Sequence, residues 1–517
     1  MRLRASLLAL AASLGLAMAA PAAAQDTLRI RLNADIRSTD PGVNRDANTD
    51  GIVWHVLEGL VALRGDATVT PMLAERVDVS DDGLTYTFTL REGVRFHNGA
   101  TLTSADVAFA FERFRRRETN WRCRGDLDSS VTRVTAIETP DARTVVFRLE
   151  RPSALFLTIL ARTDCGQAGI FHRDSLNPDG TWRAPIGTGP FRLGEWRRGQ
   201  FIDLLRFEDY AALPGEPDGL AGNKTARVER VRFQIIPDEA AARTALQAGN
   251  IDILNDARTR DIPELRQRGF QISSASSFDL QVLLMQTRDP LLQDVRMRRA
   301  IAHAIDAPEL VRALTEGGSR PSRSPIPPAS AFNTPAMLEV PARDVAAARR
   351  LAAEAGYRGQ VLRIVTTRRF EAFFEIAVTV QDMLRDAGIN AEIEVIEWAT
   401  QLDRYLRGDF QLMAFGFSAR LDPSLSFEMF TGPKATQPRK VWDNPEVEAM
   451  LEASMKESDP DRRRAIFEGM FTRLLEEVPM IAFYSSTNNS AVAPRVQGFR
   501  SWAVDAPRAW GVSIAAR

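Results

Sequence analysis

The chain has 517 residues, of which 44% are hydrophobic and 26% are charged, and its formal net charge is -1 at pH 7. This length exceeds what one ordinary core fills, so two or more lobes are expected. Because the net charge is close to zero, the protein as a whole has no strongly positive electrostatic potential, which argues against nucleic acid as a partner.

The first 24 residues have the composition of a secretory signal peptide. Arg2 and Arg4 precede an apolar run over residues 5–20, and three alanines offer a cleavage site before Gln25. The run is shorter than the ~20 residues that span a bilayer, which disfavours the alternative of a membrane anchor. No cysteine lies directly after this run, so a lipoprotein is not expected. The mature protein is predicted to be free in the periplasm.

The segment from Pro71 to Phe114 predicts a hairpin followed by a helix. Asp82-Gly83 is a hairpin-turn dipeptide, and apolar residues then alternate with threonines as in a half-buried strand. Thr103 and Asp106 fit a capping box, and apolar residues follow at helical spacing. Further strands are predicted over 28–32, 144–149, 231–236 and 251–254, with a helix over 238–248.

Cys123 and Cys165 are the only cysteines in the chain. In an oxidising compartment they are predicted to form one disulfide, which would stabilise the fold by ~3–4 kcal/mol in the chain-entropy model. Two separate buried thiols are the alternative. A catalytic thiol is disfavoured because no histidine is close to either cysteine in sequence.

From Asp294 onward, helices and strands alternate. After a Pro/Gly/Ser-rich loop over 317–335, helices are predicted over 344–355, 370–387 and 400–407, and strands over 361–365, 391–396 and 411–417. This alternation predicts a mostly parallel sheet in a second α/β lobe.

Two more predicted helices (445–455 and 459–477) and a strand (480–484) precede a tail too short for another domain. The tail is therefore expected to return to the first lobe, with crossover strands near 276–284 and 481–488. Two lobes joined by two crossovers form a hinge that can close around a ligand.

Two stretches carry a family resemblance. LAE followed by VSDDGLTYTFTLREGVRFHNG and LTSADV, together with PIGTGPFRLGEWRRGQFIDLLRF, resembles the family 5 extracytoplasmic solute-binding proteins, and the resemblance covers almost the whole mature chain. It implies a two-lobed α/β periplasmic binding protein of type II, in the large class with an extra subdomain. The expected parts are lobe I over 25–276 with a subdomain inserted at about 49–182, lobe II over 277–486, and a return to lobe I over 487–517.

The same resemblance implies a function in transport. The protein is expected to be a monomer that captures a small peptide or peptide-like solute by hinge closure and delivers it to the permease subunits of an ABC importer. Within the family, the alternative ligand is an opine, a sugar-linked amino acid or another anionic conjugate. A nickel-chelate or haem carrier, a secreted enzyme, a folding helper and a sensory role remain further alternatives.

Arg368 and Arg369 are candidate ligand residues. They follow a predicted strand and precede a helix, where α/β sheets place ligand sites, and arginine binds carboxylates bidentately. In dipeptide-binding relatives an arginine in this segment holds the peptide carboxylate, and Arg368 is the nearest match. A solvated arginine at a helix start is the alternative.

The segment AFGFSARLDPSLSFEMF over 414–430 is the second candidate. In peptide-binding relatives an aromatic residue followed three positions later by Asp holds the ligand's amino group. Phe417 matches the aromatic residue, but Arg420 replaces the Asp, so Asp422 would have to bind the amine. Ser418 lies in the same pattern, G-x-S-x-R-x-D-P, which resembles another branch of the family. An Arg420–Asp422 structural pair is the alternative.

Phe370, Trp398 and Phe278 are candidates for the cleft wall, since the first two follow predicted strands and the third lies near the predicted hinge. Core packing is equally compatible with each of them.

No catalytic group, metal site or cofactor is predicted. Gly416-Phe417-Ser418 begins like a nucleophile elbow, but the closing glycine is missing and no histidine follows His303. The four histidines are far apart in sequence and form no zinc-type pattern. The protein is therefore expected to bind its ligand without altering it.

Overall fold

A computed structural model describes residues 27–43, 47–129, 131–504 and 506–515. The predicted signal peptide lies outside these residues. No helix in the described ranges is both long and apolar enough to cross a membrane.

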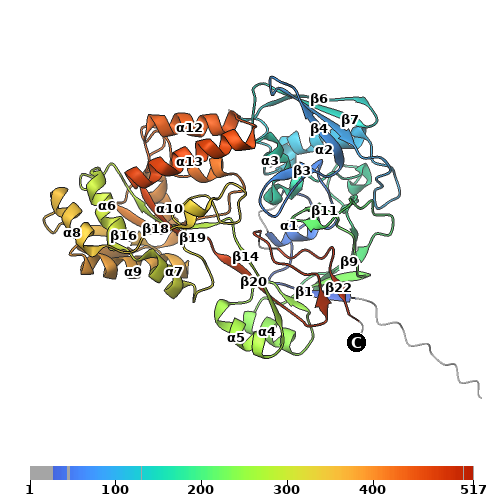
Figure 1. Cartoon of the computed structure of the whole chain (residues 1–517). Coiled ribbons are helices and arrows are strands. Elements are labelled where there is room, and N and C mark those ends of the chain that lie inside the picture. The colour runs from blue at the N-terminus through green and yellow to red at the C-terminus, as the bar shows by residue number, and fades with distance from the viewer. Residues whose placement is uncertain (1–26, 44–46, 130, 505, 516–517) are drawn as a thin grey trace, which may run out of the picture.

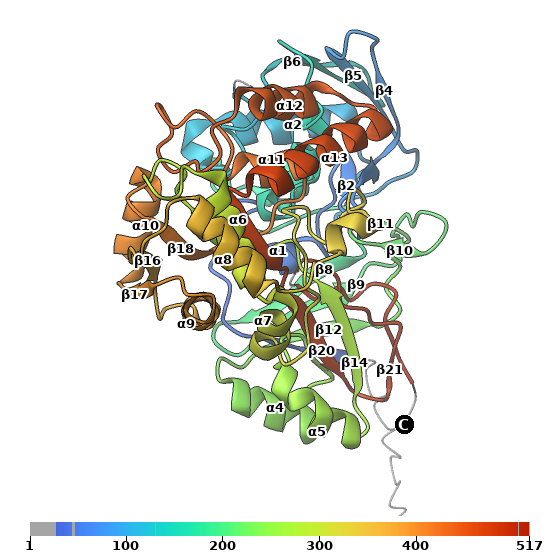
Figure 2. The ribbon, with the colours of Figure 1, turned by 60° about the vertical axis from the view of Figure 1, so that its left-hand side comes forward.

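Two lobes lie side by side and are joined by strands that pass between them (Figure 1). The first lobe is built on a seven-stranded sheet in which β1 runs parallel to β12 and β13. Its strand order is β14 (Gln271–Ser276), β20 (Thr487–Val492), β13 (Ile253–Leu254), β1 (Thr27–Leu32), β12 (Arg230–Ile235), β9 (Phe201–Arg206) and β8 (Phe191–Arg197). Helices α4 (Glu239–Gln247) and α5 (Ile262–Gln267) lie beside the β14 end (Figure 2).

The first lobe also carries a four-stranded antiparallel sheet. Its order is β4 (Ala74–Val79), β5 (Thr85–Leu90), β7 (Thr144–Leu149) and β6 (Val134–Asp141). Tyr86, Phe88 and Leu90 of β5 are buried while the intervening threonines are half-buried, so the sequence alternation predicted this strand. Helix α2 (Ser104–Arg115) packs against β6 and β7.

Shorter elements complete the first lobe. They are α1 (Ala47–Val53), α3 (Phe156–Ala161), β2 (Val61–Leu63), β3 (Val69–Pro71), β10 (Pro217–Asp218), β11 (Ala221–Gly222), β21 (Val496–Gln497), β22 (Ser513–Ile514), η1 (Arg117–Thr119), η2 (Thr163–Ala168), η3 (Arg173–Ser175) and η4 (Thr259–Asp261).

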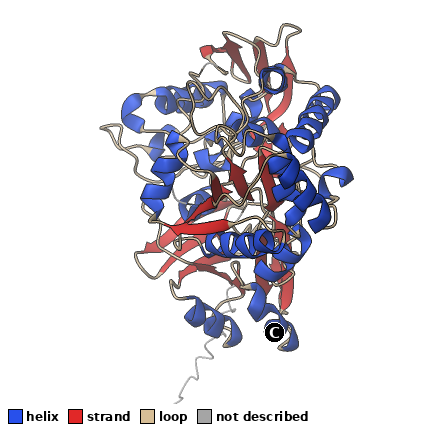
Figure 3. Ribbon diagram, turned by 90° about the vertical axis from the view of Figure 1, so that its left-hand side faces the viewer, coloured by secondary structure: helices blue, strands red, loops and turns tan. Residues whose placement is uncertain are grey.

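The second lobe is built on a five-stranded sheet with helices packed around it (Figure 3). The strand order is β17 (Ala391–Val395), β16 (Leu362–Thr366), β18 (Leu412–Phe417), β15 (Leu280–Met285) and β19 (Met480–Tyr484). The helices are α6 (Val295–Ala304), α7 (Ala307–Leu314), η5 (Pro335–Leu338), α8 (Val345–Glu354), α9 (Glu371–Asp386), α10 (Trp398–Arg407), α11 (Pro423–Glu428), α12 (Pro445–Lys456) and α13 (Pro460–Glu477).

The second sheet is mixed, because β15 runs antiparallel to both of its neighbours. The other four strands share one direction, as the parallel pairs of β16 with β17 and with β18 show. The reason is that β15 brings the chain out of the first lobe, whereas the other strands run back toward it. All six residues of β15 are buried, as expected for a strand in the middle of a covered sheet.

Both crossovers occur at short linkers. The chain leaves β14 at Ser276 and enters β15 at Leu280, and it returns from β19 at Tyr484 to β20 at Thr487. The two linkers are tied together by Asp279, whose carboxylate accepts hydrogen bonds from the Ser486 backbone N–H at 2.7 Å and hydroxyl at 2.6 Å. The lobe and subdomain boundaries that were drawn from the sequence remain predictions.

Candidate functional site

The second lobe has a pocket of about 570 Å³ at the carboxyl ends of its parallel strands. The loops that follow β16, β17 and β18 meet there, at the edge of the sheet where α/β folds commonly bind ligands. It is lined by Asp279, Gln281, Phe370, Phe373, Trp398, Leu402, Tyr405, Leu406, Phe415, Gly416, Phe417, Ser418, Arg420, Glu428, Met429 and Arg439. Five of the nine predicted ligand residues are therefore brought together: Phe370, Trp398, Phe417, Ser418 and Arg420.

An aromatic wall forms one side of this pocket. The ring of Tyr405 stacks on Phe415 with centroids 4.6 Å apart, and Trp398 stacks on the same ring at 5.9 Å. Phe370 meets Trp398 edge-on at 4.9 Å. Gly416 makes this packing possible, because a Cβ there would lie 2.5 Å from a ring carbon of Phe373.

Some apolar side chains of the pocket are exposed to solvent. Phe370, Leu402 and Leu406 are 39%, 37% and 52% exposed. Exposed apolar residues that lie together in one pocket are typical of a binding surface.

The polar groups of the pocket come from different elements. Arg439 donates to a carboxylate oxygen of Glu428 at 3.1 Å and to the Met429 carbonyl at 2.8 Å. Gln281 donates through Nε2 to Asp279 at 3.2 Å, while its Oε1 is buried and has no hydrogen-bond partner among the described residues. That oxygen is an acceptor for which the described residues supply no donor.

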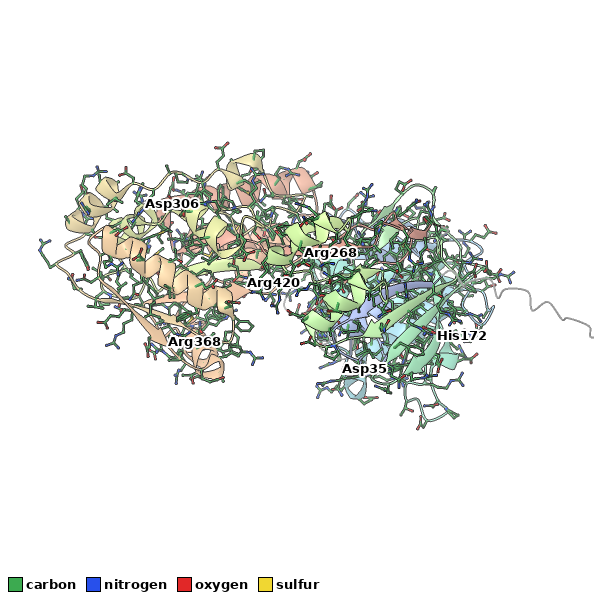
Figure 4. All side chains as sticks on the ribbon, turned by 90° about the horizontal axis from the view of Figure 1, so that it is seen from below. Asp35, His172, Arg268, Asp306, Arg368 and Arg420 are labelled. Carbon is green, nitrogen blue, oxygen red and sulfur yellow. A yellow bond between two sulfur atoms is a disulfide. The ribbon has the colours of Figure 1, made fainter. Side chains whose placement is uncertain are left out.

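Arg420 lies near the junction of the lobes, whereas Arg368 lies farther from it (Figure 4). The Nη1 of Arg420 donates to the hydroxyl of Ser418 at 2.8 Å and to the carbonyls of Ser418 and Ala419 at 3.0 and 3.1 Å. Its backbone N–H donates to the Phe278 carbonyl at 3.2 Å. No carboxylate of the described residues lies within ion-pair distance of its guanidinium.

Burial lowers the pKa of Arg420, and the positive charge of Arg162 lowers it further, while Glu428 and Asp164 act in the opposite direction. Arg162 and Asp164 belong to the first lobe. The two lobes therefore place charged groups close to one another beside the pocket.

Asp422 does not line the pocket, which corrects the sequence-based expectation that it could bind an amine. It is buried, and the Arg463 guanidinium donates to its two carboxylate oxygens at 2.8 and 3.0 Å. It also caps α11 by accepting from the Ser424 N–H at 2.9 Å. The proposed Arg420–Asp422 pair is likewise absent, because the partner of Asp422 is Arg463, which comes from α13.

Arg368, Arg369 and Phe278 also lie outside the lining of the pocket. The Arg368 guanidinium rests 3.8 Å from the ring centroid of Phe374 on α9. Arg369 is exposed and lies 5.7 Å from the ring of Phe370. Phe278 is buried in the linker between β14 and β15, which makes it a structural residue of the crossover.

Several lining residues were missed by the sequence analysis. Leu402, Tyr405 and Leu406 share one face of α10, a spacing that is also typical of core packing. Glu428 lies within the candidate segment 414–430 but matches no position of its motif, and Arg439 comes from a segment where the sequence shows no ligand-type pattern. The helix α11 itself was missed, although Asp422-Pro423 is a cap followed by Pro at its first turn.

Cys123 and Cys165 form a disulfide with a Cα–Cα distance of 5.9 Å. Together with Asp164 they are the only group among the described residues with metal-ligating spacing. Since the two sulfurs are bonded to each other, this group lacks the thiolates that a soft metal would need.

Comparisons with known proteins agree with this architecture. Residues 68–438 match the family described as bacterial extracellular solute-binding proteins, family 5 Middle. The chain is 24% identical to the oligopeptide-binding protein AppA of Bacillus subtilis (strain 168), with 83% of this chain and 80% of that protein aligned. It is 25% identical to the glutathione-binding protein GsiB of Salmonella typhimurium, with 94% and 95% aligned.

Two solved structures are similar over nearly the whole chain. HbpA2 from Haemophilus parasuis has a TM-score of 0.83 and 25% identity, covering 95% of this chain and 100% of that one. AgaA of A. tumefaciens R10 in complex with agropinic acid has a TM-score of 0.68 and 25% identity, covering 95% and 99%. The matched family spans well over half of the chain, and the chain therefore belongs to the bacterial extracellular solute-binding proteins of family 5.

Proposed function

We propose that this protein captures a small peptide or peptide-like solute between its lobes and delivers it to the permease subunits of an ABC importer. The pocket beside the crossover linkers carries this proposal. Its exposed apolar residues, Phe370, Leu402 and Leu406, face solvent in the present arrangement. A ligand that contacts them together with the first lobe would favour closure, because those contacts exist in the closed state alone.

A peptide suits the chemistry of the pocket. Gln281 Oε1 can accept from a ligand N–H, Arg420 can donate to a carboxylate, and the aromatic wall can cover an apolar side chain. Similarity to the oligopeptide-binding AppA and the glutathione-binding GsiB supports the same class.

An anionic conjugate such as an opine or a sugar-linked amino acid is the second candidate. Arg420 favours it, since a guanidinium in this position repels a free amine and attracts an acid. Similarity to AgaA, which was solved with agropinic acid, points the same way.

The location, the oligomeric state and the domain boundaries are also part of this proposal. The protein would act in the periplasm as a monomer after removal of residues 1–24, with lobe I over 25–276 and 487–517, a subdomain at about 49–182, and lobe II over 277–486. Binding without turnover is part of the proposal and is supported by membership of a family of solute-binding proteins.

Native mass spectrometry of the protein purified from the periplasm tests the proposal. The expected result is a mass excess that disappears on denaturation and yields a peptide series or a single acidic conjugate. Recovery of no solute, combined with no thermal stabilisation by peptide and opine libraries, would contradict it.

A further inference from the structure

The first lobe presents a tightly braced segment toward the second lobe. This segment, η2, follows α3 and contains Cys165, whose disulfide ties it to Cys123. The indole of Trp54 donates to the Thr163 carbonyl and that of Trp121 donates to the Cys165 carbonyl, both at 3.1 Å. One covalent bond and two buried indoles thus fix its backbone.

The backbone of η2 is strained as well as braced. Gly166, Gln167 and Ala168 follow one another with φ of 63°, 58° and 44°. Left-handed residues other than glycine are strained and persist where the surroundings fix them, commonly at functional sites. The segment is therefore held in a conformation that it would not adopt alone.

Charged side chains form a cluster around this segment. Arg162 donates bidentately to Asp164 at 3.0 and 2.8 Å and to Asp126 at 2.6 Å. Arg122 lies 3.4 Å from Asp164. Arg420 of the second lobe adds a third arginine to these two aspartates, and Glu428, which also acts on Arg420, is already paired with Arg439 and Lys440, so the group keeps a positive excess.

Two contacts and one electrostatic interaction place this cluster beside the pocket. The Ala154 N–H, just before α3, donates to the Met455 carbonyl of α12 at 2.9 Å. Leu421, the residue after Arg420, packs against the core of the first lobe, as does Leu425. Arg162 and Asp164 are near enough to Arg420 to influence its protonation equilibrium.

We propose that the disulfide-braced segment η2 is the first-lobe side of the ligand site, and that Arg162 and Arg420 together bind an anionic group of the ligand. Arg420, which lines the pocket together with the aromatic wall, supplies the second-lobe side. The ligand class is thus a peptide or peptide-like acid whose carboxylate lies between the lobes, with an apolar group on Trp398, Phe415 and Tyr405. This inference rests on the proposed function and specifies its ligand.

The two arginines would act together only when the lobes are near one another. Arg162 is held by acids of its own lobe and Arg420 by hydroxyl and carbonyl oxygens, so a carboxylate between them gains charge-assisted hydrogen bonds from both sides. An amide in place of the carboxylate keeps the shape and loses the charge.

Two matched libraries of di- to pentapeptides, one with free C-terminal carboxylates and one C-terminally amidated, test the inference by thermal shift and calorimetry. The native protein should be stabilised by the free-acid library and much less by the amidated one. Arg420→Met and Arg162→Met should each weaken apparent binding of the free acids about ten- to a hundredfold. Arg312→Met, on the exposed face of α7, is the control and should bind like the native protein.

Asp164→Asn separates ligand contact from a structural role. It increases the positive excess beside Arg420, so binding of the free acids should tighten, whereas a purely structural role for the Arg162–Asp164 pair predicts weaker binding. Equal binding of the two libraries, or native affinity in Arg162→Met, would overturn the inference and leave the transport proposal standing. No stabilisation by either library would instead contradict the transport proposal itself.

Discussion

At the scale of single residues, Asp422 shows how a side chain in a ligand-type motif can serve the fold instead. Its carboxylate and the Arg463 guanidinium are both almost completely buried, and each is the other's charge partner. A buried ion pair adds little net stability, but removal of one partner leaves an unpaired charge in the interior.

Arg463→Met and Asp422→Asn should therefore each lower the free energy of unfolding by about 3–5 kcal/mol, measured by urea denaturation. Ligand affinity of the folded fraction should stay native. Glu138→Gln, which breaks the exposed pair with Arg148, is the control and should cost less than about 1 kcal/mol. Lost affinity with unchanged stability in Asp422→Asn would show that Asp422 contacts the ligand.

His55 is a second residue with a purely internal role. It is fully buried, with Nδ1 2.7 Å from the Gly51 carbonyl and Nε2 accepting from the Ala509 N–H at 3.0 Å. Burial lowers the pKa of His55 from 6.5 to about 3. The neutral ring thus joins α1 to the C-terminal segment of the first lobe.

The sign of the resulting pH dependence follows from proton binding. Between pH 6.5 and about 3 the unfolded chain protonates this histidine while the folded chain does not, so the free energy of unfolding should fall as pH falls through this window. Urea denaturation at pH 7, 6 and 5 measures the slope. His55→Asn should be less stable at pH 7 but decline less steeply, and equal slopes would argue against a buried neutral ring.

At the scale of elements, sequence patterns predicted the strands and helices with strong periodicity. β5 alternates buried and half-buried residues, and α9 buries residues at helical spacing, so both followed from the chain alone. The short helix α11 was missed although its cap is a local signal, and the antiparallel direction of β15 could not be predicted because it depends on where the chain goes next. The pocket was predicted in part: Phe417 and Arg420 lie in a local motif, whereas Glu428 lies later in the same segment outside that motif and Arg439 comes from another segment.

The disulfide is an element-scale constraint whose loss is measurable. It closes a sequence separation of 42 residues. The chain-entropy model gives about 4 kcal/mol for a loop of that length. Cys123→Ala with Cys165→Ala should reduce the free energy of unfolding by about that amount in urea denaturation. Native stability of this double variant would show that the packing of Trp54 and Trp121 is sufficient.

Helix α10 supplies a test of the exposed apolar residues that line the pocket. Leu402 and Leu406 are exposed, so Leu402→Gln and Leu406→Gln should change the free energy of unfolding by less than about 0.5 kcal/mol. Each should nevertheless weaken binding of the native solute about tenfold or more in calorimetry, because closure would bury these side chains. Val378→Gln, on a comparably exposed position of α9 outside the pocket, is the matched control.

At the scale of the whole molecule, the two crossover linkers determine how the lobes can move. They lie side by side, since β14 pairs with β20 in one lobe and β15 with β19 in the other. Asp279 ties them together with hydrogen bonds to Ser486. The lobes can rotate about this paired strip without breaking either sheet.

Solution X-ray scattering should accordingly show a smaller radius of gyration when the native solute is added, while the secondary-structure content measured by circular dichroism stays constant. Asp279→Asn should loosen the linker and reduce the difference between the two states. An unchanged scattering curve at saturating solute would contradict closure.

The scarcity of lysine gives the molecule a practical property. Lysine occurs at positions 224, 434, 440 and 456, and the first three side chains are buried. Lys456 is exposed and directly follows Met455, whose carbonyl accepts the hydrogen bond that joins the lobes at Ala154. An amine-reactive fluorophore applied at high pH to the folded protein would thus react preferentially, apart from the terminal amine, with Lys456 at the rim where the lobes meet, since Lys434 is only 7% exposed. Its emission would report opening and closing without any engineered cysteine.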